Sequence, residues 1–207
     1  MRILVLGVLT MSLGTAQVSL TVEDGPDGSV LCHVRNDSSS AITAHVIRDK
    51  TRYEIFDHLL GGSTHGKPIQ PGQTFDQKIA KGTAANEWKL VAALFEDGTT
   101  FGDASTIADL LETRRLTYRD IDIGIQMLRD GKSVVDFEAW AKSMPAARGP
   151  IYHGMVAWWV IRYFKQDRTA PDIIDRLQTW RDQLARSKPP IPTTPLPAQG
   201  ERGQRPH

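Results

Sequence analysis

Cysteine is almost absent from this chain, which holds Cys32 and no second thiol to pair with it. An internal disulfide is therefore excluded, and a fold in an oxidising compartment must depend on its apolar core alone. An excess of charge of one sign is absent too, because 25 lysines and arginines face 24 aspartates and glutamates. Without a basic stripe, we expect no nucleic-acid partner.

Long apolar runs and catalytic signatures are also missing. The most apolar N-terminal stretch, from Ile3 to Leu13, is interrupted by Thr10 and Ser12 and is shorter than the roughly 18 residues of a spanning helix. We therefore expect no stable membrane insertion. The G-x-S-x-G pattern of acyl-transfer enzymes does not occur around Ser63. The sequence favours a protein that is not an enzyme and that needs no cofactor.

The first residues have the composition of a secretory signal peptide. Arg2 precedes the apolar run, and Gly14, Thr15 and Ala16 supply the small residues of a cleavage site. We expect residues 1–16 to be removed near Ala16, so that the mature chain begins at Gln17. This predicts a secreted or periplasmic location.

Hydrophobic side chains recur at every second position over the first half of the mature chain, the spacing of half-buried strands. Turn residues separate these stretches, including Asp97-Gly98, a strong two-residue hairpin signal. Strands are expected at 18–22, 30–34, 42–46, 53–56, 73–80, 88–94 and, in short form, from Thr99. Six or seven short strands predict an antiparallel β-sandwich over residues 17–103.

One feature of this half resembles the immunoglobulin-like modules of bacterial envelope proteins. A strand ending in Asn36, Asp37 and Ser38 is expected to pair with Ile42 to Ile47, and Pro71-Gly72 opens a later strand. The resemblance is one of fold and covers residues 17–103. It implies a binding or spacing role more than chemistry.

The apolar spacing changes to three and four residues from Ala104 onward, which is typical of helices. About four helices are expected in residues 104–187: one ending at Gly131, one from Ser133 to Pro145, one over 151–164, and one beginning at Thr169. The fold class is therefore α+β, a sandwich followed by a helical region. Residues 188–207 hold 6 of the 12 prolines and are predicted to be disordered or extended.

Two groups of residues are candidates for a binding site. Asp57, His58 and His65 lie on a glycine-rich loop and carry the donors that a metal ion prefers, although their spacing matches no known signature. Aromatic rings in the helical half offer a stacking surface for a ligand, unless they form a buried core: Tyr152, Trp158, Trp159 and Tyr163. Glu96, Asp97 and Asp103 also cluster, but Asp97-Gly98 is already explained as a turn.

These observations predict an exported, non-catalytic binding or structural module that acts by surface recognition of a protein or polysaccharide. The alternative is an extracytoplasmic metal-dependent hydrolase that uses Asp57, His58 and His65. A third hypothesis is a peripheral membrane partner that uses the aromatic helix over 151–164.

Overall fold

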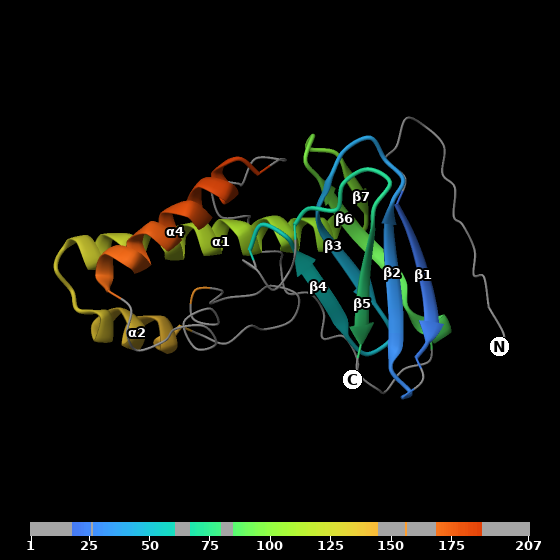
Figure 1. Cartoon of the computed structure of the whole chain (residues 1–207), viewed down its shortest axis with the longest axis horizontal. Coiled ribbons are helices and arrows are strands. Elements are labelled where there is room, and N and C mark those ends of the chain that lie inside the picture. Colours follow the sequence, from blue (N-terminus) through green and yellow to red (C-terminus); the bar gives the residue numbers. More distant parts are fainter. Residues whose placement is uncertain are drawn as a thin grey trace.

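The computed structural model describes residues 18–25, 27–60, 67–79, 85–144, 156 and 169–187. Its elements follow the predicted order, strands first and helices after them (Figure 1). They are β1 (Val18–Asp24), β2 (Val30–Asn36), β3 (Ile42–Arg48), β4 (Tyr53–Asp57), β5 (Thr74–Ile79), a short 3-10 helix η2 (Ala85–Glu87), β6 (Lys89–Phe95), β7 (Thr100–Gly102), α1 (Ala104–Arg129), α2 (Val134–Ser143) and α4 (Ala170–Ala185).

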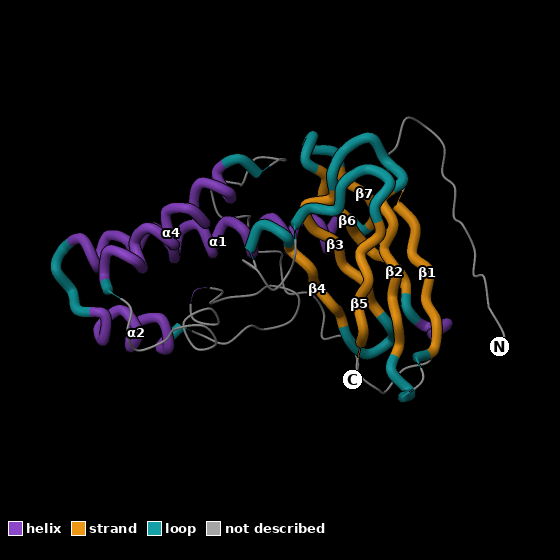
Figure 2. The backbone as a smooth tube through the Cα atoms, viewed as in Figure 1, coloured by secondary structure: helices purple, strands orange, loops and turns teal. Residues whose placement is uncertain are grey.

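The strands form two antiparallel sheets, as the period-two pattern predicts. Sheet A has the strand order β1-β2-β5, and sheet B has the order β4-β3-β6-β7. The strand that ends at Asn36 and the strand from Ile42 therefore lie in different sheets, so the expected pairing between them is wrong. One apolar cluster joins them, with Val30, Cys32 and Val34 from sheet A against residues of sheet B such as Ile47 and Phe95. The arrangement is compatible with a β-sandwich, and Figure 2 shows the strands gathered at one end of the molecule.

Strand β3 is buried on both faces, unlike β2, in which buried and partly exposed residues alternate. The second face is buried because the first turns of α1 cover it. Leu110 of α1 packs there on Ala44 and Val46 of β3 and on Leu94 of β6. Sheet B therefore lies between sheet A and a helix.

Two β-bulges adjust sheet B to this helix. The register shifts between Ile42 and Ala44, which leaves Thr43 as an extra residue on β3, and it shifts again opposite Val91 of β6. The Val91 carbonyl accepts from the backbone N–H of Asp103 at 2.8 Å, directly before α1 begins. Gly102 has φ +98°, and a Cβ there would lie 2.0 Å from the Val91 oxygen, so this approach requires glycine.

The helices begin where their capping residues predict. Asp103 caps α1 by accepting from the Thr106 N–H, and Ser133 with Asp136 forms a capping box on α2. Thr169 with Asp172 does the same for α4. The described part of the chain contains these three α-helices, whereas about four were expected. The helix predicted over 151–164 lies outside the described residues except for Val156.

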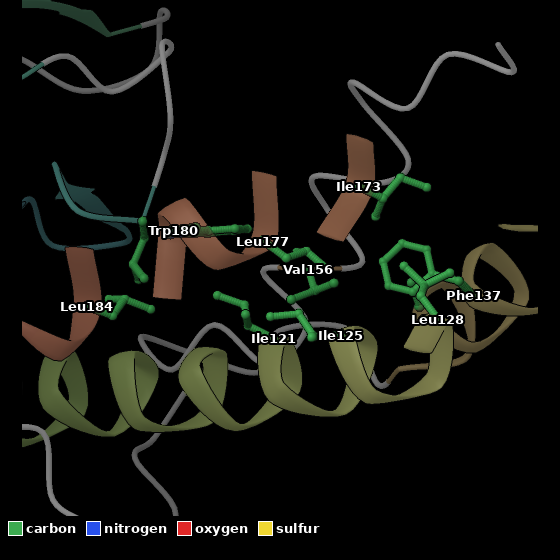
Figure 3. Close-up of a cluster of buried hydrophobic side chains, with 11 residues drawn as sticks. Ile121, Ile125, Leu128, Phe137, Val156, Ile173, Leu177, Trp180 and Leu184 are labelled. Carbon is green, nitrogen blue, oxygen red and sulfur yellow. The ribbon is translucent and has the colours of Figure 1, made fainter. Parts of the chain in front are cut away.

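The helices share a second apolar core that is separate from the one between the sheets. Figure 3 shows Val156 between side chains of α1 and α4, with Phe137 of α2 at one end. The remaining members of this core come mainly from α1 and α4: Ile121, Ile125, Leu128, Ile173, Leu177, Trp180 and Leu184. Helix α1 thus contributes its first turns to sheet B and its later turns to the helical core.

Among the described helices, none combines the length and apolarity of a membrane-spanning segment. The predicted signal peptide and proline-rich tail fall outside the described residues.

Candidate functional site: the seam between sheets and helices

The chain from Asp57 to Leu60, here called the seam segment, touches both halves of the protein. It follows directly from β4, and its backbone turns because the Leu60 N–H donates to the Asp57 carbonyl at 3.2 Å. Leu60 is 3% exposed and belongs to the helical core, whereas the His58 ring contacts Phe75 of sheet A. Four consecutive residues therefore connect the two apolar cores.

A buried arginine holds the seam segment to α1. Arg114 is fully buried, and its guanidinium donates to both carboxylate oxygens of Asp57, with Nε–Oδ2 at 2.7 Å and Nη2–Oδ1 at 3.1 Å. The same guanidinium donates to the Thr43 carbonyl at 3.2 Å and to the Ser187 hydroxyl at 2.6 Å. This Arg114 cluster joins β3, β4, α1 and the end of α4.

The cluster is stable because its charge is matched. A buried ion costs several kcal/mol of desolvation, and only close pairing with further hydrogen bonds offsets that cost. The fork of the Arg114 guanidinium meets both Asp57 oxygens, the geometry in which arginine binds carboxylates best. The Thr43 carbonyl of the cluster also accepts from the His58 N–H at 3.0 Å.

Helix α4 makes a second connection to the seam segment. The indole Nε1 of Trp180 donates to the Leu59 carbonyl at 2.9 Å. Because Trp180 is also part of the helical core, this bond ties that core to the backbone after β4. Among the described residues, Leu110 and Arg114 thus hold the helices to sheet B, and Trp180 holds them to the seam segment.

A pair of buried histidines lies on the sheet side of the seam. His45 of β3 is fully buried, and its Nδ1 lies 3.4 Å from Nε2 of His58. The His45 ring stacks on Phe56 and meets Phe75 edge-on. Burial, and then the charge of His58, keep the pKa of His45 well below its usual range. The His45 Nε2 is buried and has no hydrogen-bond partner among the described residues. His45 is therefore held as a neutral ring.

Of the three predicted metal ligands, Asp57 and His58 lie within the described residues. The carboxylate of Asp57 accepts from Arg114 and from the Leu59 N–H at 2.9 Å, and His58 lies against His45. The third predicted ligand, His65, lies outside the described residues. Within the part of the chain that the structure describes, no three histidine, cysteine, aspartate or glutamate residues are placed to hold a metal.

Of the other candidate residues, some lie outside the described part of the chain and some lie within it. Tyr152, Trp158, Trp159 and Tyr163 lie outside the described residues. Asp97 accepts from the N–H and hydroxyl of Thr99, which lowers its pKa, as expected for a turn residue. Asp103 has its pKa lowered to about 2 by Ser105 and Thr106 at the start of α1. Both aspartates therefore have structural roles.

Asn36 has the form of a glycosylation acceptor with Ser38, but its side chain is occupied. It is fully buried, and its Nδ2 donates to the carbonyls of Ser40 at 2.8 Å and Ile69 at 2.7 Å. This amide joins the turn after β2 to the chain before β5.

The residues that sequence reasoning missed are Arg114 and His45. Arg114 follows Leu110 by four residues and precedes Ile121 by seven, so it occupies the apolar stripe of its helix. A charged residue at such a position is a detectable signal for a buried ion pair. His45 falls in a strand, and its ring faces sheet A, where it contacts Phe75, so the packing of the two sheets makes it interior.

Comparison of this chain with protein-family models, with curated proteins and with solved structures finds no match.

Proposed function

We propose that this protein is an exported, non-catalytic binding or structural module, in which an immunoglobulin-like β-sandwich carries an attached helical arm. It acts by surface recognition, with a protein or polysaccharide of the cell envelope as its partner. The mature chain begins near Gln17 after cleavage of residues 1–16. Its parts are the sandwich over 17–103, the helical region over 104–187 and the tail over 188–207.

The observation that carries this proposal is the Arg114 cluster. A module that recognises a partner by its surface needs its parts fixed relative to one another before binding, since ordering them on binding costs affinity. The guanidinium of Arg114 donates its hydrogen bonds to β3, β4 and the chain after α4. Asp57, the one carboxylate among the three predicted metal ligands, binds Arg114 and so helps to fix the helices to the sheet.

Export is tested by expressing the full chain in a bacterial host and separating periplasm from cytoplasm. We expect the exported form to have the mass of a chain starting at Gln17. A Leu6→Arg variant, which breaks the apolar run, should remain uncleaved and cytoplasmic. A wild-type chain that stays uncleaved in the cytoplasm would contradict an exported protein.

Recognition is tested by co-sedimentation of the purified mature chain with peptidoglycan sacculi and with envelope polysaccharide. Trp180→Phe removes the bond to Leu59 while keeping an aromatic ring, so it should weaken retention if the fixed helices form part of the surface. Trp140→Phe, on α2, is the matched control and should bind like the wild type. Absence of binding to envelope material would contradict this choice of partner.

The metal-dependent hydrolase remains the alternative, and a separate experiment addresses it. The purified chain is titrated with Zn²⁺ or Ca²⁺ while its melting temperature and its hydrolysis of ester and peptide substrates are followed. A rise of several degrees together with metal-dependent turnover, both lost in His58→Ala and His65→Ala, would overturn the binding-module proposal.

A further inference from the structure

The outer face of sheet A holds a histidine between two carboxylates, and the proposed function does not use it. His33 lies on the central strand β2, with Thr21 of β1 and Asp76 of β5 as its cross-strand partners. Its Nδ1 lies 2.7 Å from Oδ1 of Asp76, and its Nε2 lies 3.5 Å from Oε1 of Glu23, on β1. One imidazole therefore touches both neighbouring strands.

The geometry suits the protonated ring better than the neutral one. An ionised carboxylate only accepts hydrogen bonds, so each ring nitrogen needs a proton to bond its partner. The imidazolium has two N–H groups and satisfies both Glu23 and Asp76. The neutral ring has one, and its other nitrogen would turn a lone pair toward a carboxylate oxygen.

The other charged groups on this face have partners of their own. Arg35, two residues along β2, bonds Asp37 at 2.6 Å, and Lys78 of β5 bonds Asp27 at 2.7 Å. Glu23 and Asp76 are thus the carboxylates that face His33, from β1 and β5 respectively. Deprotonation of His33 would leave two negative charges beside an uncharged ring.

We propose that His33 is a proton-controlled clasp that fastens β1 and β5 to the central strand β2. Strands β1 and β5 are the two edges of sheet A, and we expect β1 to loosen first when the clasp opens. Its inward residues Val18, Leu20 and Val22 are only partly buried, so the outer-face contacts form a larger share of its attachment.

The direction of the pH effect follows from the contacts. The hydrogen bond with Asp76, and then the charges of Asp76 and Glu23, raise the pKa of His33 despite some desolvation. The stabilisation is fully present below the unfolded-state pKa of about 6.5 and is lost as the pH rises through the higher folded-state pKa. β1 is therefore held more firmly in mild acid than in mild base.

The test combines two measurements on the purified chain. The pKa of His33 is measured from its ring signals in an NMR titration, and the hydrogen-exchange protection of β1 amides is measured across the same pH range, corrected for intrinsic rates. We expect His33 to titrate above 6.5 and β1 protection to fall roughly two- to fivefold with the same midpoint. Asp76→Asn should lower the His33 pKa more than Glu23→Gln, because its contact is shorter.

Two variants separate the clasp from a general pH effect. His33→Gln should make β1 protection independent of pH, whereas Arg35→Gln, on the same strand and face, should keep the wild-type dependence. A His33 pKa at or below 6.5 would overturn the proposal. So would an unchanged pH dependence of β1 protection in His33→Gln.

Discussion

Sheets A and B share an inner core, but their outer faces differ in what covers them. The outer face of sheet B lies under α1 and contains alanine, valine and leucine, with Arg114 at its margin. The described side chains on the outer face of sheet A include ion pairs that are exposed or partly exposed to solvent. The charged groups of the two sheets thus differ in their solvation. Helix α1 covers the outer face of sheet B, whereas solvent reaches the ion pairs of sheet A.

The difference also decides how much each charged contact is worth. An exposed ion pair contributes little, since water solvates the separated charges almost as well. A buried pair contributes little over an apolar replacement, but breaking it leaves one charge without solvent or partner. Disruption of the Arg114 cluster should therefore lower the free energy of unfolding more than disruption of any ion pair on sheet A.

The largest effect is expected at Arg114. Arg114→Ala leaves the buried Asp57 carboxylate without its charged partner and should lower the free energy of unfolding by about 3–5 kcal/mol. The double variant Arg114→Met/Asp57→Leu removes both charges and should recover most of this loss. Urea denaturation of the wild type, the single variant and the double variant measures these free energies of unfolding. A double variant no more stable than Arg114→Ala would show that the cluster acts through shape, not charge.

Gly102 offers a second way to disturb the covered sheet. Gly102→Ala must place a Cβ 2.0 Å from the Val91 oxygen at a φ of +98°, so we expect a loss of about 3 kcal/mol. Gly72 is the matched control, because it also has positive φ (+77°) but nothing within 4 Å of an added Cβ. Gly72→Ala should cost only about 1 kcal/mol in the same denaturation experiment. Equal losses would mean that backbone strain alone matters.

The sequence predicts the two halves well because each period is a local property. Alternation along β2 and the stripe of α1 depend on residues a few positions apart, and caps such as Ser133 with Asp136 are local as well. The bounds of strands and helices therefore lie close to the expected ones. The requirement for glycine at position 102, the end of β7, comes from the close approach of the Val91 carbonyl. The spacing of residues in the sequence cannot reveal this contact.

The seam was not predictable in the same way. Arg114 and Asp57 are 57 positions apart, and Trp180 meets Leu59 across 121 positions. The glycines and histidines after β4 suggested an exposed metal loop, yet residues 57–60 contact two apolar cores. Only the docking of α1 on sheet B determines that Asp57 meets a buried guanidinium.

The buried histidine predicts a pH dependence opposite to that of the surface clasp. The pKa of His45 is lowered in the folded state, so below about 6.5 the unfolded chain binds more protons. The free energy of unfolding should then fall by up to about 1.4 kcal/mol for each pH unit below that value. Denaturation at pH 7 and pH 5.5 measures this loss, which His45→Phe should reduce and His33→Gln should not. An identical acid dependence in His45→Phe would assign the loss to other groups.

The smallest expected effect compares two threonines, one on the outer face of each sheet. Thr43 is 4% exposed, and its hydroxyl donates to the Leu94 carbonyl at 3.2 Å beside Arg114. Thr43→Val keeps the shape but removes this hydroxyl, so we expect a loss of about 1 kcal/mol. Thr21 is exposed on β1, and Thr21→Val should change the free energy of unfolding by less than about 0.5 kcal/mol. If the two variants lost the same stability, cover by α1 would not be what distinguishes sheet B from sheet A.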